Sequence, residues 1–247
     1  MTDLHMHSTF SDGAHTPEKM IEEGIRRGLC CIGLSDHAWA SWDDAAMPKE
    51  KIEEYRRELT RLQRLYGDRI RILRGIERDY YTDEDDEYEY VIGSVHALRM
   101  PDGHMLPVDW EPENMERDCR QYFCGDWYAL TEEFFRREAD VVRKTRCDLI
   151  GHFDLVSKFN EQRRWFDPAH PRYRAAWQQA ADRLLETGIP FEINTGAIAR
   201  GYRTDAYPSR EIRNYLRERG ARLVLSSDAH SREHICFEFQ RFAEEAE

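Results

Sequence analysis

Residues 30–37 read Cys-Cys-Ile-Gly-Leu-Ser-Asp-His, a short apolar run that ends in a carboxylate and an imidazole. The run from Cys30 to Leu34 is short and does not alternate between polar and apolar residues, which is typical of a buried parallel strand. Asp36 and His37 follow it directly. The same order, an apolar run and then a residue able to bind metal or carry protons, recurs along the chain, and this recurrence decides the fold prediction.

Six further apolar runs fit short buried strands, at Met1–Met6, Ile70–Ile76, Tyr90–Val95, Asp148–Ile150, Pro190–Ile193 and Arg222–Leu225. Helical patterns lie between most of them, at 16–28, 52–66, 127–145, 170–187, 208–219 and 232–246. Strands that alternate with helices predict an α/β fold with a parallel sheet. Seven strands in 247 residues favour one barrel-like domain over 1–247 rather than two open sheets.

The stretch 99–126 fits this rhythm least, because it contains Pro101, Asp102-Gly103, Pro107 and Pro112. We predict a long excursion on the ligand side of the barrel, where long loops are often functional. An ordinary surface insertion is equally compatible with the pattern.

Residues that bind metals or carry protons follow the predicted strands one after another. They are His5 and His7, Asp36 and His37, Glu77, His96, His152, Glu192 with Asn194, and Asp228 with His230. In a parallel α/β barrel all strands end on one face, and active sites are built there. We therefore expect these side chains to converge.

Imidazole and carboxylate groups are common metal ligands in proteins, and a mixture of both at one barrel mouth is typical of a metal site. Several crowded carboxylates without a cation would repel one another and become partly protonated. His5 and His7 are two residues apart on a strand and so face the same side, and Asp228 and His230 have the same spacing. Two such pairs on neighbouring edges can hold more than one ion.

Each candidate also has a plain structural explanation. A single strand-end histidine is commonly structural, and Asp12 also fits as the turn residue of Ser11-Asp12-Gly13. Glu192 points either into the barrel or away, and Asn194 is read as a support for a ligand or a loop cap. We expect surface positions for His15, His104, His170 and His234, and a solvated loop or helix start for the acid run 83–87.

Composition narrows the function classes. The net charge is −12, which argues against broad nucleic-acid binding. No apolar run approaches the roughly 20 residues that span a bilayer, and residues 1–5 lack the features of a signal peptide, so we expect a soluble, cytoplasmic protein. The six cysteines form no CxxC pair and are expected to be reduced thiols, with Cys30, Cys31 and Cys147 packed in the core.

The motifs together resemble the polymerase and histidinol phosphatase (PHP) superfamily. The similarity lies in His5-Met6-His7-Ser8 with Ser11-Asp12-Gly13, in Ser35-Asp36-His37, in Glu77 with Ser94-Val95-His96, and in Ser227-Asp228-Ala229-His230. Within it the chain is most similar to the histidinol-phosphate phosphatases, through Gly75-Ile76-Glu77, Gly151-His152-Phe153-Asp154, Glu192-Ile193-Asn194-Thr195 and Tyr207-Pro208-Ser209.

The resemblance implies a distorted (β/α)7 TIM-like barrel with three divalent ions at its C-terminal mouth. Zinc, iron and manganese all suit such mixed nitrogen and oxygen ligands. By the same resemblance one ion would sit on His5, His7, Glu77 and Asp228. The second would share Glu77 and add His96 and His152, and the third would take Asp12, His37 and His230.

The implied reaction is hydrolysis of a small phosphomonoester, with a hydroxide shared by the two ions that Glu77 bridges as the nucleophile. Asp228 or His230 would protonate the leaving group, and the sequence does not choose between them. Phosphate attracts arginine, and the candidates are Arg163, Arg164, Arg200 and Arg203, with Lys158 as a further possibility. The resemblance favours Arg163 and Arg200, and the acid run 83–87 is a candidate for holding the substrate's amine.

Four functions remain open at this stage. The first is a histidinol-phosphate phosphatase of histidine synthesis, and the second is a phosphoesterase for another sugar or nucleotide phosphate. The third is a nuclease, which would need a basic track with stacking aromatics. The fourth is a metal-bound interaction domain without catalysis, which predicts missing ligands. The sequence gives no indication of oligomeric state.

Overall fold

The computed structural model describes residues 1–82 and 88–246. The acid run 83–87 lies outside these described residues, so its predicted roles are not addressed. No helix among the described residues has the length and apolar character needed to cross a bilayer.

The main sheet is parallel, and its seven strands follow one another in chain order, β1-β2-β3-β4-β7-β8-β9. They are β1 (Thr2–Asp3), β2 (Cys31–Leu34), β3 (Arg71–Asp79), β4 (Tyr90–Ser94), β7 (Leu149–Ile150), β8 (Phe191–Asn194) and β9 (Leu223–Ser226). A parallel bridge between Met6 and Ala229 links the first and last strands beyond their ends. The sheet is therefore a nearly closed barrel, and the predicted (β/α)7 TIM-like fold is confirmed.

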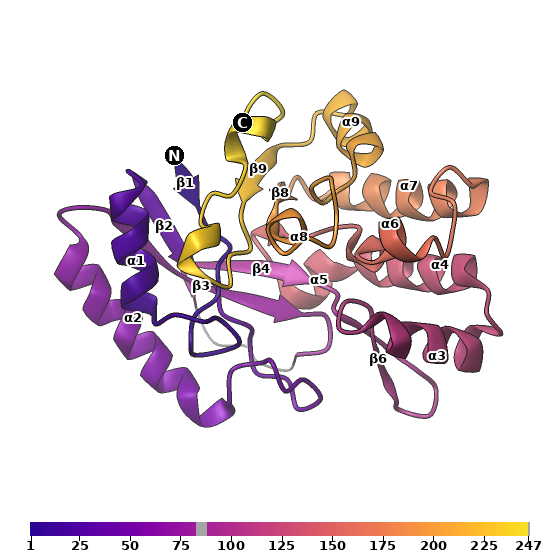
Figure 1. Cartoon of the computed structure of the whole chain (residues 1–247), viewed down its shortest axis with the longest axis horizontal. Helices are drawn as coiled ribbons and strands as arrows, with labels where there is room; N and C mark the ends of the chain where they lie inside the picture. The colour runs from indigo at the N-terminus through magenta and orange to yellow at the C-terminus, as the bar shows by residue number, and fades with distance from the viewer. Residues whose placement is uncertain (83–87, 247) are drawn as a thin grey trace.

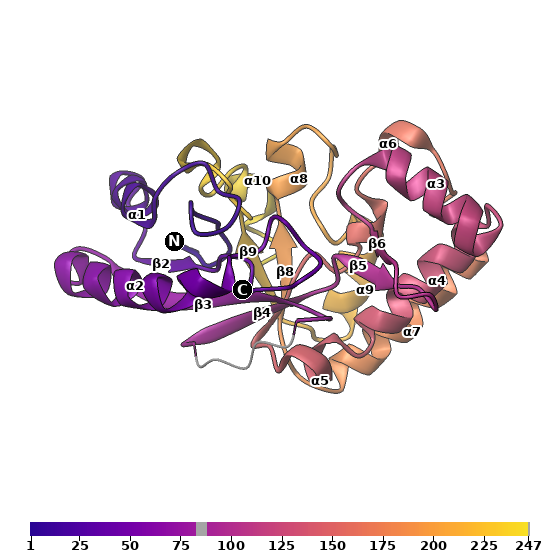
Figure 2. The same cartoon turned by 90° about the horizontal axis from the view of Figure 1, so that it is seen from below.

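Helices cover the outside of the barrel (Figures 1 and 2). The covering helices are α1 (Pro17–Arg26), α2 (Ile52–Tyr66), α4 (Trp127–Glu138), α5 (Val141–Thr145), α7 (Pro171–Leu185) and α9 (Arg210–Glu218). The short helices α6 (Asn160–Arg163), α8 (Gly196–Ala199) and α10 (Phe239–Phe242) lie in the segments that follow β7, β8 and β9. Figure 1 shows α1 and α2 on the side of β2 and β3, whereas α4, α6 and α7 lie at the opposite end of the molecule. The start of α1 follows the predicted signal, since the Thr16 side chain accepts a hydrogen bond from Lys19 N and Pro17 occupies the first turn.

The stretch 99–126 is more ordered than predicted. It contains most of an antiparallel hairpin, β5 (Ala97–Arg99) with β6 (Met105–Pro107), and then helix α3 (Pro112–Phe123). Pro112 lies in the first turn of α3, where its missing N–H costs no hydrogen bond. The prolines thus delimit elements here rather than indicating an irregular loop.

The predicted helix at 232–246 is largely wrong, because the chain there forms a 3₁₀ turn at Arg232–His234 and only the short α10. The buried carboxylate of Asp3 accepts a hydrogen bond of 3.0 Å from the backbone N–H of Cys236. Cys236 and Glu238 then take positive φ angles of 54° and 51°, which no helix accommodates. A distant carboxylate therefore outweighs the local helical pattern.

Inside the barrel a small apolar cluster is built around Tyr90, separate from the main core between the sheet and the helices. The Tyr90 ring of β4 lies over Gly75 on the adjacent strand β3 and over Gly33 on the next strand, β2, and its hydroxyl donates a hydrogen bond of 2.5 Å to Leu4 O. Glycine is required at both positions, since a Cβ at Gly75 would lie 2.1 Å from Tyr90 Cζ. These contacts fill the barrel below its mouth.

We expect Gly75→Ala to lower the free energy of unfolding by about 1–3 kcal/mol, because overpacking forces the fixed Tyr90 ring to move. Urea denaturation of the purified protein measures this. In a Tyr90→Leu background the same glycine substitution should cost clearly less. An equal cost in both backgrounds would contradict the proposed contact.

The side chain of Glu138 on α4 is fully buried, and neither carboxylate oxygen has a hydrogen-bond partner among the described residues. Burial raises its pKa well above the usual value, with further upward contributions from Asp79 and Asp154. A raised pKa in the folded state means that folding favours the protonated form. As pH rises above the pKa of this carboxyl in the unfolded chain and towards its higher pKa in the folded protein, Glu138 lowers the free energy of unfolding increasingly.

We expect Glu138→Met to raise the free energy of unfolding by about 1–3 kcal/mol at about pH 8, with a smaller gain near pH 5. Glu138→Gln is the matched control, because it keeps the shape and abolishes the titration. Urea unfolding across this pH range should show a flatter profile for both variants. A wild-type profile that neither variant changes would exclude Glu138 as its source.

Candidate metal centre and phosphate pocket

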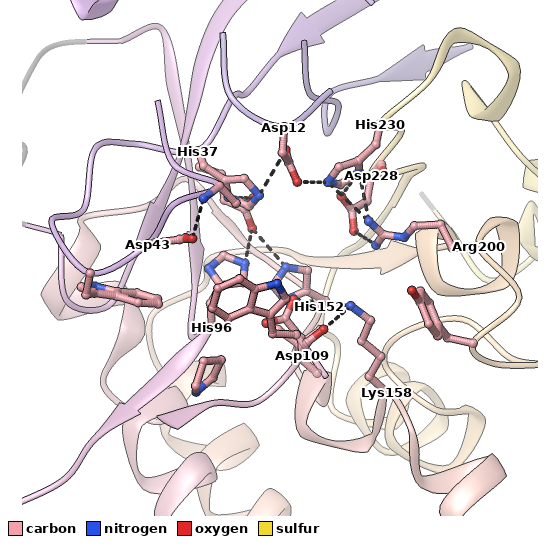
Figure 3. A pocket seen from close by; sticks show the side chains of 17 residues that line it. Asp12, His37, Asp43, His96, Asp109, His152, Lys158, Arg200, Asp228 and His230 are labelled. Atoms are coloured by element: carbon pink, nitrogen blue, oxygen red, sulfur yellow. Dashed lines mark hydrogen bonds and ion pairs between the residues drawn. The ribbon is translucent and has the colours of Figure 1, made fainter. Parts of the chain in front are cut away.

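The nine residues predicted as metal ligands all lie at the barrel mouth, each placed by a strand end or the loop after it. His5 and His7 follow β1, His37 follows β2, Glu77 lies near the end of β3, His96 follows β4, His152 follows β7, Asp228 and His230 follow β9, and Asp12 lies on the loop before α1. Seven of them line one cavity, shown in Figure 3, and only His5 and His7 do not. The parallel strands therefore achieve the convergence that the sequence predicts.

Glu77 is the centre of this cluster. Its Oε2 lies 3.0 Å from His37 Nδ1 and 3.2 Å from His5 Nε2. Its Oε1 lies 3.0 Å from His152 Nε2 and 3.3 Å from His96 Nε2. Burial alone would raise the pKa of this carboxyl, but the surrounding imidazoles hold it well below its usual value. Glu77 is thus a carboxylate whose two oxygens serve two different sets of histidines.

The ligand atoms gather into three overlapping groups, each within 4.8 Å. These groups are His5, His7 and Asp228; His37, Glu77 and His96; and His7, Asp12, His37 and His230. They match the predicted division in part. His7 lies close enough to join the Asp12 group, and His37 rather than His152 completes the group around Glu77 and His96.

Unpartnered atoms show that this cluster fits a cation. His5 Nε2, both ring nitrogens of His7, Glu77 Oε2 and His152 Nδ1 are buried without a hydrogen-bond partner among the described residues. Burial and the neighbouring His230 and His37 lower the pKa of His7 to about 3, so its ring is neutral and has a lone pair to offer. Buried polar atoms without partners are costly, and a bound metal ion would satisfy them.

Residues behind the cluster hold its members in place. Glu192 points into the barrel, and its Oε2 lies 2.8 Å from His5 Nδ1. Asn194 Nδ2 donates to Glu192 Oε1 at 2.9 Å, and Asn194 Oδ1 accepts from Gly196 N at 2.9 Å. Carboxylates that bind the far nitrogen of a histidine fix its tautomer and ring orientation. Both orientations of Glu192 were open from the sequence, and the structure selects the inward one.

Asp36 fastens the loop that carries Asp12. It is fully buried and accepts hydrogen bonds from the backbone N–H and the hydroxyl of both Ser8 and Ser11, at 2.7–3.1 Å. The carboxylate thus replaces the hydrogen bonds that the loop backbone lacks. The placement of Asp12, 3.1 Å from His230 Nε2, depends on this loop.

Asp228 connects the cluster to Arg200. Its Oδ2 accepts from Arg200 Nη2 at 3.0 Å, and its Oδ1 lies 3.2 Å from His7 Nε2. Burial alone would raise the pKa of Asp228, but Arg200 and His5 hold it well below its usual value. Arg200 Nη1 also contacts the ring of His230 at 3.1 Å, so this guanidinium spans both residues of the last motif.

A cavity of about 230 Å³ opens in front of the cluster. Two cations line it, Arg200 and Lys158. The Lys158 ammonium donates to the backbone oxygen of Asp109 at 2.5 Å and lies 3.6 Å from its carboxylate. Asp109 and its neighbour Trp110 come from the 99–126 excursion, which therefore does reach the ligand side of the barrel as predicted.

The other three predicted phosphate ligands do not line this cavity. Arg163 forms an ion pair with Glu113 of α3, and Arg164 is an exposed residue that ends α6. Arg203 is buried elsewhere, where it donates to Ser157 Oγ at 3.0 Å and lies over the Tyr207 ring. The excursion explains the difference, because α3 supplies the acid that binds Arg163.

The cavity also contains residues that sequence reasoning missed, namely Trp42, Asp43, Asp109, Trp110 and Tyr202. None of them follows a strand directly, so the strand-end pattern could not find them. The histidines expected at the surface, His15, His104, His170 and His234, are half-buried and lie outside the cluster. His104 pairs with Asp118 at 2.9 Å, and His170 caps the start of α7.

Comparison with known proteins agrees with this architecture. A "Probable histidinol-phosphatase" of Deinococcus radiodurans is 30% identical over 97% of this chain and 90% of its own length. A solved structure from Listeria monocytogenes superposes with a TM-score of 0.85 at 18% identity, covering 98% of this chain and all of its own.

The crystal structure of the Lactococcus lactis histidinol phosphate phosphatase, complexed with zinc, L-histidinol and phosphate, covers 99% of this chain and 91% of its own, with a TM-score of 0.74 at 22% identity. These likenesses show the fold. The family model described as PHP domain matches residues 3–196, which include seven of the nine clustered residues. This chain therefore belongs to the PHP domain family.

Proposed function

We propose that this protein is a metal-dependent phosphomonoesterase that converts L-histidinol phosphate and water to L-histidinol and phosphate. The observation that carries the reaction class is the joint placement of the histidine–carboxylate cluster, Arg200 and Lys158 around one cavity. The substrate is supported by full-length relatives that carry the histidinol-phosphatase name. A cytoplasmic location stays a prediction.

In this proposal three divalent ions bind the cluster. His5, His7, Glu77 and Asp228 hold the first, Glu77, His96 and His152 the second, and Asp12, His37 and His230 the third. Zinc, iron and manganese all suit this donor set, and zinc is the ion in the Lactococcus lactis structure. When bound, such ions supply a water of lowered pKa as nucleophile and neutralise charge on the phosphoryl oxygens.

The protein's own groups orient the ester. Arg200 offers a planar donor fork to the phosphoryl oxygens, and Lys158 adds a compact charge on the same side of the cavity (Figure 3). The two oxygens of Glu77 face different histidines, so this carboxylate would be shared by two of the ions. Asp228 and His230 both lie at the cavity wall beside Arg200. Of these two candidates for protonating the leaving alkoxide, the proposal favours His230, because Arg200 and His5 hold the pKa of Asp228 well below its usual value and keep it ionised.

We expect purified protein with counted metals to release phosphate from histidinol phosphate in preference to other phosphomonoesters. His96→Ala and Asp228→Asn should each lower kcat/KM by at least about 100-fold and reduce the amount of bound metal, because each variant loses a side chain proposed to bind an ion directly. Malachite-green phosphate assays and elemental analysis measure both effects. Hydrolysis of another ester with histidinol phosphate inert would keep the chemistry and overturn the substrate.

Arg200→Gln should lower kcat/KM about 100-fold or more, because charge-assisted contacts to the phosphoryl group are removed. Arg163→Gln is the matched control, since Arg163 pairs with Glu113 outside the cavity. It should stay within about threefold of wild type. Steady-state kinetics with melting temperatures for both variants decide this. The reverse order of effects would return the phosphate contact to Arg163.

A further inference from the structure

The cavity is electrostatically divided. Arg200 and Lys158 lie on one side, and Asp43 lies on the opposite side, beyond His37 (Figure 3). The cationic side suits a phosphate, as proposed above. The carboxylate side has no role in that proposal, because Asp43 belongs to none of the three groups of metal-ligating atoms.

Asp43 is held in place yet has no counter-ion. Its Oδ1 accepts a hydrogen bond of 2.9 Å from Ala45 N, which fixes the carboxylate within its own turn. Among the described residues no basic side chain lies within ion-pair distance of the Asp43 carboxylate, whereas the Asp109 carboxylate has Lys158 as a partner. Asp43 therefore presents a half-buried carboxylate to the cavity on the side away from Arg200 and Lys158, where it can pair with a cationic group of a ligand.

Two tryptophans accompany it. Trp110 lines the cavity although its side chain is 60% exposed, one of the few large apolar residues left so open. Trp42, next to Asp43 in sequence, also lines the cavity, and its buried Nε1–H has no hydrogen-bond partner among the described residues. Indole faces bind flat rings and cations, so the two side chains suit an alcohol that carries such groups.

We infer that Asp43, Trp42 and Trp110 form the subsite for the leaving alcohol, and that it selects phosphomonoesters whose alcohol carries both an ammonium group and a flat ring. The ester would lie across the cavity, with its phosphate toward Arg200 and Lys158 and its ammonium toward Asp43. This inference rests on the proposed function and adds the residues that determine specificity. The acid run 83–87, which the sequence offers as another candidate for holding the amine, lies outside the described residues.

The test compares histidinol phosphate with its deamino analogue, which lacks only the ammonium group. Asp43→Asn keeps the turn hydrogen bond and removes the charge, so kcat/KM for histidinol phosphate should fall about 10- to 100-fold, mainly through KM. For the deamino analogue it should change less than about threefold. Asp44→Asn is the control, because Asp44 is exposed and does not line this cavity.

Trp110→Ala should lower kcat/KM for histidinol phosphate and for its deamino analogue about 10-fold, and should leave that for ethyl phosphate, which carries no ring, within about threefold of wild type. Equal losses on all three esters would overturn the role of Trp110. Equal losses on histidinol phosphate and its deamino analogue in Asp43→Asn would overturn the assignment of Asp43, as would no loss on either. If the wild-type protein does not hydrolyse histidinol phosphate, the proposed substrate is wrong. The comparison of 2-aminoethyl phosphate with ethyl phosphate then tests Asp43 independently, and an unchanged ratio in Asp43→Asn would overturn the subsite.

Discussion

The Glu77 carboxylate, held ionised inside the barrel by the imidazoles around it, is the constraint on which the site depends. A buried carboxylate is unfavourable unless opposite charge compensates it. Here the compensation comes from strand ends on both sides, since the histidines that contact Glu77 follow β1, β2, β4 and β7. Only a closed parallel barrel brings so many strand ends within reach of one side chain.

Closure is therefore a functional requirement as well as a packing result. The bridge between Met6 and Ala229 aligns the segment that carries His5 and His7 with the one that carries Asp228 and His230. Asp3 strengthens the same seam, because it accepts hydrogen bonds from the backbone and hydroxyl of Ser227. The carboxylate that interrupts the predicted C-terminal helix also fixes the residue directly before Asp228.

The sequence was sufficient to predict the fold and the cluster, because both follow from local patterns. An apolar run predicts a strand, and the residue that follows the run must then lie at the end of that strand. Seven runs then place His5 and Asp228 together without knowledge of any side-chain contact. Glu192 shows the limit of this reasoning, since its direction depends on how β8 is registered against its neighbours, which no local pattern states.

The cavity wall was predicted less well, for a different reason. Arg163 and Lys158 lie on the same loop, and nothing in their local sequence separates them. The path of the 99–126 excursion decides between them, because Glu113 of α3 binds Arg163 while Asp109 binds Lys158 and keeps it in the cavity. These contacts join residues far apart in the sequence, so the spacing of residues along the chain does not predict them.

This division has a consequence for how selectivity arises on the fold. The residues proposed as metal ligands are placed by strand ends. The residues proposed to face the leaving alcohol, Asp43 and Trp110, come instead from the loop after β2 and from the 99–126 excursion, and loops of this kind tolerate change better than strands do. Changes in these two loops can therefore alter which substrate binds while the chemistry at Glu77 stays the same. For this reason the residues at the strand ends indicate the reaction class, and the residues of the loops indicate the substrate.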